Sequence, residues 1–135
     1  MEFPVLFRRS ALLVGTFFAT IVHTSMAFTP NTIEDELSQL IRDHKLQGRP
    51  ALVQDAILSL VARAKAIDLG MNGYTAHTNL DGYGPNRAVR LAGYELPKWW
   101  PNERDSNYIE SLAFGYDTAT KAFDAWLNSP AHKGH

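Results

Sequence analysis

The chain has 135 residues, of which 45% are apolar, 20% charged and 11% aromatic, with 13 basic against 14 acidic side chains. These values are typical of a single globular domain and exclude a coiled coil, a collagen-like repeat and a disordered tail. The formal charge of −1 provides no general cationic field, so no nucleic-acid partner is expected. The absence of cysteine excludes disulfides, thiolate zinc sites and cysteine nucleophiles.

The first 27 residues have the pattern of a cleavable export signal. Arg8 and Arg9 precede an uncharged apolar run at 11–22, and Ser25 and Ala27 are the small residues that a signal peptidase requires. The run is much shorter than the roughly 20 residues of a membrane-spanning helix. We therefore predict a signal peptide at 1–27, a mature chain that begins at Phe28, and a secreted or periplasmic protein without a stable membrane span.

Two helices are predicted in the first half of the mature chain. From Asn31 to Gln47, apolar residues recur with helical spacing, and Asn31 or Thr32 can cap the exposed amides. From about Asp55 to Leu69, small and apolar residues repeat every four positions, and Gly70 is expected to end this second helix. Glycine, proline and asparagine then follow one another through 72–87, which predicts a loop.

The second half of the chain is predicted to contain helices and one strand. A short helix is compatible with 87–93, and a polar loop follows at 95–107. The best strand candidate is 108–116, and a helix is predicted at about 118–128 with Thr118 or Asp117 as its cap. Pro130 closes this helix, and the segment from Ser129 can begin another with His132 in its first turn.

The loop at 95–107 contains adjacent tryptophans, Trp99 and Trp100. We expect one ring to pack inward and the other to be exposed. A structural role is favoured over a contact role.

Four histidines follow the predicted signal, at positions 44, 77, 132 and 135. A single histidine is more often a surface or hydrogen-bonded residue than a ligand, and His44 and His135 are assigned no function. The segment from His77 to Gly82 imitates the start of a calcium-binding loop, but its twelfth position is Ala88 instead of the bidentate glutamate, so we reject it. The motifs of zinc peptidases, serine hydrolases and phosphate-binding loops are absent.

Several short motifs follow one another in a characteristic order. They are Leu40-Ile41 to Leu52 as the first helix and its exit, the helix pattern at 55–66, His77 with Asp81-Gly82, Pro85-x-Arg87, Ala92-Gly93-Tyr94, Glu110-Ser-Leu-Ala113-x-Gly115, and Trp126-Leu-Asn-Ser129-Pro130-Ala-His132. Their order resembles that of the CAP superfamily, also called the SCP domain, of cysteine-rich secretory, antigen 5 and pathogenesis-related proteins, in its cysteine-free bacterial branch. The resemblance covers about residues 33–135. It implies an α+β fold, a three-layer α-β-α sandwich, over 28–135.

The resemblance also implies a functional site. In the family, a central cleft gathers two histidines and acidic residues, and the corresponding positions here are His77, Glu110 and His132. Two imidazoles and one carboxylate suit a divalent cation such as zinc. The alternative is a hydrogen-bonded structural cluster without metal.

Three departures from the family pattern bear on this site. Ser111 stands where the family has an asparagine, and no acidic residue occupies the second glutamate position, where 127–129 are Leu-Asn-Ser. Family members also continue past the second histidine into further strands, so the CAP domain is expected to be incomplete at its C-terminal end.

The sequence favours an exported binding module with a cation site and a small molecule, lipid or peptide as ligand. One alternative is a zinc-assisted hydrolase in which Glu110 activates a metal-bound water between His77 and His132. Another is a structural or surface-interaction domain without metal. No residue is assigned a catalytic role.

Overall fold

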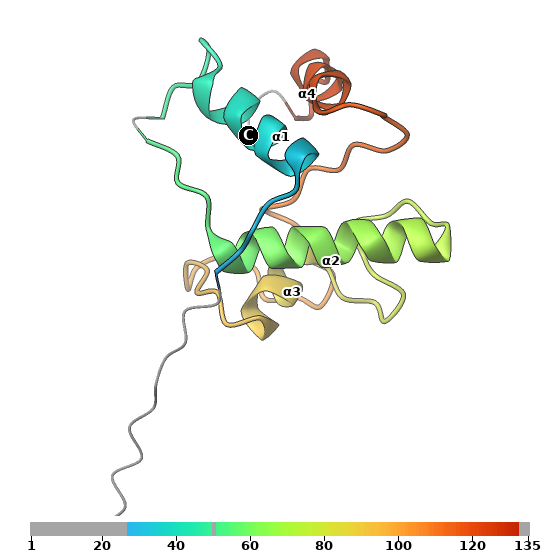
Figure 1. Cartoon of the computed structure of the whole chain (residues 1–135). Coiled ribbons are helices and arrows are strands. Elements are labelled where there is room, and N and C mark those ends of the chain that lie inside the picture. Colours follow the sequence, from blue (N-terminus) through green and yellow to red (C-terminus); the bar gives the residue numbers. More distant parts are fainter. Residues whose placement is uncertain (1–26, 50, 133–135) are drawn as a thin grey trace, which may run out of the picture.

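The computed structural model of the chain describes residues 27–49 and 51–132. The predicted signal peptide lies outside these residues, apart from Ala27. Four helices follow in order, namely α1 (Thr32–Asp43), α2 (Ala56–Asn72), α3 (Pro85–Leu91) and α4 (Ala119–Asn128) (Figure 1). Within the described ranges, no helix combines the length and the apolar character needed to cross a membrane.

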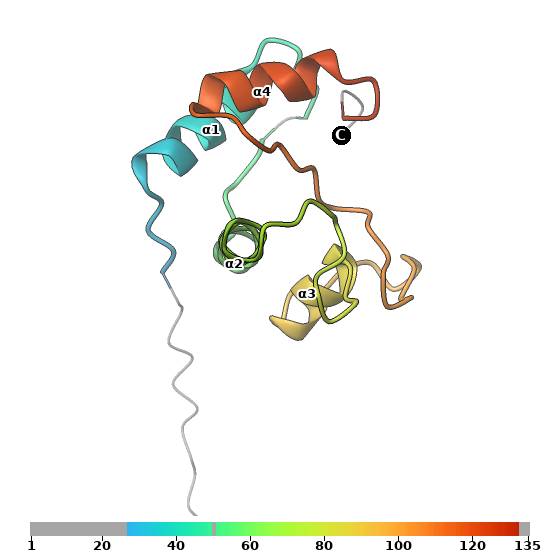
Figure 2. The same cartoon turned by 90° about the vertical axis from the view of Figure 1, so that its right-hand side faces the viewer.

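The helices form two layers. α1 packs on α4, and α2 packs on α3. Figure 2 shows the α1–α4 pair above and the α2–α3 pair below, with the chain from about 109 to 117 passing between them. The layers are joined by an ion pair, because the guanidinium of Arg63 on α2 binds the carboxylate of Glu34 on α1. This hydrogen-bonded guanidinium lowers the pKa of Glu34 below its usual value.

The predicted α-β-α sandwich is wrong for the described part of the chain, which is 44% helical and contains no strand. The predicted strand at 108–116 runs as an irregular segment between the two helical layers (Figure 2). A strand exists only where a neighbouring backbone completes its hydrogen bonds. No other described segment lies beside this one as a strand, so the apolar pattern at 109–114 has no sheet to join.

The caps of the helices follow from short polar side chains. Asn31 accepts from the backbone N–H of Glu34, and Glu34 accepts from the N–H of Asn31, which completes a capping box. At the starts of α2 and α4, the side chains of Asp55 and Thr118 each accept from the backbone N–H three residues further on. The sequence predicts this cap for Thr118. The predicted end of α2 at Gly70 is wrong, because the left-handed residue that ends the helix is Gly73, with φ of 64°.

α3 begins two residues before the predicted position, at Pro85. Proline suits the first turn of a helix, because its missing N–H would have no partner there. The preceding Gly84 lies against the 101–108 loop and donates its N–H to the carbonyl of Arg104 at 2.8 Å. A Cβ atom on Gly84 would lie 2.4 Å from the carbonyl carbon and oxygen of Asp105. Only glycine permits this close approach of two backbones.

The apolar core of the described residues is small and divided. Leu69 is buried on α2 and Val89 on α3, whereas Ala119 and Phe123 are buried on α4. These few buried side chains leave space between the layers unfilled, and this space forms the candidate site described below.

We expect Gly84→Ala to lower the free energy of unfolding by roughly 1–3 kcal/mol, because the added methyl group overlaps the backbone of Asp105. The matched control is Gly70→Ala, whose methyl group meets nothing within 4 Å. Gly70 lies inside α2, so this change should raise the free energy of unfolding by about 0.5–1 kcal/mol. Urea denaturation measures both, and equal effects of the two changes would contradict the close approach at Gly84.

Candidate functional site

Two hollows adjoin the segment between the layers. The main hollow, of about 550 Å³, is lined by side chains of α1, α2 and α4 and by residues 110–114. The side hollow, of about 430 Å³, is lined by the other face of α2, by the 77–84 loop and by the start of α3. Lys65 and Glu110 line both hollows, so these two charged residues stand at the boundary between them.

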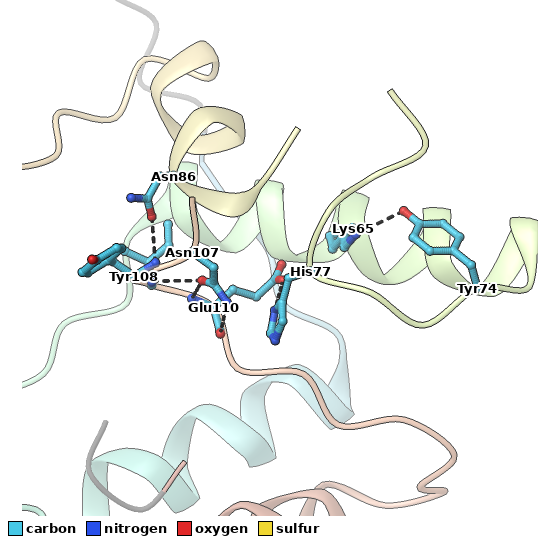
Figure 3. Close-up of polar contacts among 8 residues, drawn as sticks. Lys65, Tyr74, His77, Asn86, Asn107, Tyr108 and Glu110 are labelled. Atoms are coloured by element: carbon cyan, nitrogen blue, oxygen red, sulfur yellow. Dashed lines mark hydrogen bonds and ion pairs between the residues drawn. The ribbon is translucent and has the colours of Figure 1, made fainter. Parts of the chain in front are cut away.

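The structure brings together two of the three predicted site residues. The Nδ1 atom of His77 lies 2.8 Å from Oε1 of Glu110 (Figure 3). The His77 side chain is 43% exposed, whereas that of Glu110 is 16% exposed. An ionised carboxylate only accepts hydrogen bonds, so Nδ1 carries the shared proton. In the neutral ring, Nε2 then keeps its lone pair and is the atom available to a ligand or a cation.

Asn107 holds the backbone of Glu110 in place. Its Oδ1 atom accepts from the N–H of Ile109 at 3.2 Å and from the N–H of Glu110 at 2.9 Å. Its Nδ2 atom donates to the carbonyl of Glu110 at 3.1 Å (Figure 3). The carboxamide therefore fixes a tight turn immediately before the segment that lines the main hollow.

Asn86 attaches this turn to α3. The residue is fully buried, its Oδ1 atom accepts from the N–H of Tyr108 at 2.9 Å, and its Nδ2 atom donates to the carbonyl of Pro101 at 3.3 Å. Its backbone N–H also donates to the carbonyl of Ser106 at 3.2 Å. One buried side chain thus attaches both ends of the 101–108 loop to α3, and Figure 3 shows the contact with Tyr108.

The two tryptophans of this loop differ as predicted. The ring of Trp100 packs against that of Tyr108, with centroids 5.9 Å apart, whereas Trp99 is 83% exposed. Arg90 on α3 supports the same loop by donating to the carbonyl of Pro101 at 3.1 Å. The prediction of one inward and one outward ring is confirmed, and its inward member helps to anchor the turn that leads to Glu110.

A second polar group extends from the boundary along α2. The ammonium of Lys65 donates to the hydroxyl of Tyr74 at 3.1 Å (Figure 3), and that hydroxyl donates to the carboxylate of Asp68. The hydrogen bond to Asp68, with smaller contributions from burial and from the charges of Asp68 and Glu110, raises the pKa of Tyr74 to about 12. The tyrosine hydroxyl therefore stays protonated beside these two carboxylates.

His132, the third predicted ligand, lines neither hollow. It lies in a turn after α4, closed by its own N–H and the carbonyl of Ser129 at 3.1 Å, and its buried Nδ1 atom has no partner among the described residues. Within 27–49 and 51–132, no three His, Asp or Glu side chains gather closely enough to hold a metal ion. The predicted helix from Ser129 appears as this turn, and residues 133–135 lie outside the described part.

His44 packs its ring edge-on against Phe123 at 5.3 Å, between α1 and α4. This packing accounts for His44 without any function at the hollows.

Neither Asn86 nor Asn107 was predicted as part of the site. For Asn86, no local pattern indicates that the side chain is buried, because its partners lie 15 and 22 positions further along the chain. For Asn107, a signal was available. Asn107 precedes Glu110 by three positions, the spacing at which a short polar side chain closes a turn onto the following amides.

No protein-family model, no curated protein and no solved structure matches the chain. The resemblance to the CAP superfamily therefore stays a prediction.

We expect Asp68→Asn to lower the pKa of Tyr74 from about 12 toward the ordinary tyrosine value of about 10, because the tyrosinate then forms without a carboxylate beside it. An alkaline titration of tyrosinate absorbance measures the change. Asp81→Asn is the matched control, because Asp81 lines the side hollow but contributes nothing to the pKa of Tyr74. If Asp68→Asn and the unchanged chain titrate alike, the assigned hydrogen bond is wrong.

Proposed function

We propose that the chain is an exported binding module whose ligand occupies the main hollow and meets Glu110 at its boundary. Apolar hollows with few polar groups are the usual ligand sites of proteins, and volumes of about 300–1,000 Å³ are typical. The main hollow, of about 550 Å³, falls within this range, and leucine, isoleucine and alanine side chains dominate its helical walls.

One observation carries the proposal. Glu110 is a largely buried carboxylate in the wall between two hollows. Two hydrogen bonds with the Asn107 side chain fix its backbone, and one hydrogen bond with His77 orients its carboxylate. Burying a charge in an apolar wall is costly unless it is paired. A held carboxylate facing empty space therefore suits the recognition of a ligand better than the stabilisation of a core.

The His77–Glu110 pair also supports weak binding of a divalent cation. His77 offers Nε2, and Glu110 orients the ring through Nδ1, which is the arrangement of a carboxylate behind a metal-binding histidine. The described residues provide no group of three ligands, so water would supply most of the coordination. This arrangement fits a loosely held ion and not a tightly bound structural one.

The proposal retains the part of the CAP resemblance that concerns the cleft. His77 and Glu110 are two of the positions at which that resemblance implies cation ligands, and they lie in contact. The proposal does not require the sandwich.

Filling the main hollow should abolish its binding of the apolar dye anilinonaphthalenesulfonate. Ala62→Trp places an indole in the main hollow, whereas Ala64→Trp, two residues away on α2, places it in the side hollow. We expect a fluorescence titration to show dye binding to the unchanged chain and to Ala64→Trp, and little or none to Ala62→Trp.

This dye also binds loosely packed states, so each protein must first show a cooperative unfolding transition. Equal dye binding by the two variants, or no binding by the unchanged chain, would contradict the main hollow as a ligand site.

Calorimetric titration with zinc tests the cation site. We expect His77→Ala to abolish binding, Glu110→Gln to weaken it by about 10- to 100-fold, and His132→Ala to leave it nearly unchanged. His132→Ala is the matched control, because His132 lines neither hollow. Equal loss in His77→Ala and His132→Ala would instead indicate that the two histidines share the ion.

A further inference from the structure

We infer that the occupant of the main hollow is an extended peptide that adds as a β-strand to residues 111–114. This inference rests on the proposed function and names the chemical class of its ligand. It is carried by the backbone of residues 111–114, by the apolar helical wall, and by the ammonium of Lys65, which forms no ion pair with a described residue.

The backbone of residues 111–114 offers a row of free hydrogen-bonding groups. Among the described residues, none donates to their carbonyls or accepts from their N–H groups, although the turn at Asn107 pairs the N–H and the carbonyl of Glu110 just before them. Ser111, Leu112 and Ala113 are half-buried. Water can bind these half-buried groups in the free protein, and a second strand would replace that water with hydrogen bonds at regular spacing.

The helical wall suits the side chains of such a strand. Leu37 and Ile41 of α1 and Leu58 and Ala62 of α2 line the main hollow, and each pair lies about one helical turn apart. In a strand, successive side chains point to opposite faces. Alternate apolar side chains of the peptide would therefore enter the hollow while its backbone pairs with residues 111–114.

One charged group of the hollow also favours a peptide. Lys65 at the boundary forms no ion pair with a described residue and donates only to the neutral hydroxyl of Tyr74. A carboxylate on the peptide complements this ammonium.

A hydrocarbon chain fits these observations less well. It would fill the apolar space, but it would also displace water from the backbone of residues 111–114 without offering hydrogen bonds in exchange. Each polar group desolvated without a partner costs about 1–3 kcal/mol. Binding by strand addition avoids this cost, because the main chain of the peptide provides both donors and acceptors.

The test uses the full chain and two synthetic hexapeptides of alternating threonine and valine, acetylated at the N-terminus and with a free C-terminal carboxylate. One is unmodified, and the other carries N-methyl groups on alternate residues, which removes the N–H donors of one edge. Amide hydrogen exchange followed by NMR reports strand pairing, and displacement of anilinonaphthalenesulfonate reports occupancy of the hollow. Sodium decanoate serves as the hydrocarbon probe.

We expect the unmodified peptide to displace the dye and to slow exchange at alternate amides of residues 111–114, by about tenfold when the peptide is at ten times its dissociation constant. The N-methylated peptide should do neither. Displacement of the dye by the peptide without slower exchange, or displacement by decanoate alone, would overturn strand addition while leaving the binding module in place. If the dye itself does not bind to the unchanged chain, this result would contradict the proposed function as well.

Discussion

The buried side chain of Asn86 is the interaction on which the site depends. Its carboxamide spans the gap between α3 and the 101–108 loop, and it satisfies a backbone donor at Tyr108 and a backbone acceptor at Pro101. An amide that is fully removed from water must have such partners, so the loop has one position in which it can dock. The close approach at Gly84 allows this docking, because any larger residue would separate the two backbones.

The contacts of Asn86 also determine the position of Glu110 beside the hollows. Tyr108 is held by Asn86, the adjacent Asn107 forms the turn, and the turn presents Glu110 to His77. The orientation of a partly buried carboxylate is thus determined by neutral amides several residues away. This arrangement leaves Glu110 and the Nε2 atom of His77 available to a ligand, since neither is required to hold the loop.

The division of the core explains why a hollow exists at all. Each helical layer buries its own few apolar residues, and the layers meet through the Glu34–Arg63 ion pair and the segment that passes between them. Arg63 is further held by the carbonyl of Thr29 and lies over the ring of Phe28 at 4.3 Å. This ion pair at one edge holds the layers together without filling the space between them. Apolar walls and backbone groups that have no partner in the described part of the chain therefore face the same space.

The helices are predictable from the sequence, because the signals for them are local. Asn31, Asp55 and Thr118 are short polar side chains that cap the amides a few residues ahead, and the spacing of apolar residues defines each helical face. The pairing of His77 with Glu110 followed from the resemblance of motif order, and the structure places the two in contact. Gly73 and not Gly70 ends α2, because the end of a helix depends on which glycine can take a left-handed conformation where the chain turns away.

The remaining features are not predictable from local sequence, because they depend on partners that are distant in the chain. The apolar pattern at 109–114 predicts a strand, but a strand needs a neighbour, and none lies beside it in the described part of the chain. Likewise, nothing in the sequence around Asn86 indicates a buried side chain. Its role exists only because the 101–108 loop returns to bury it, a contact between residues that are up to 22 positions apart and that no local pattern encodes.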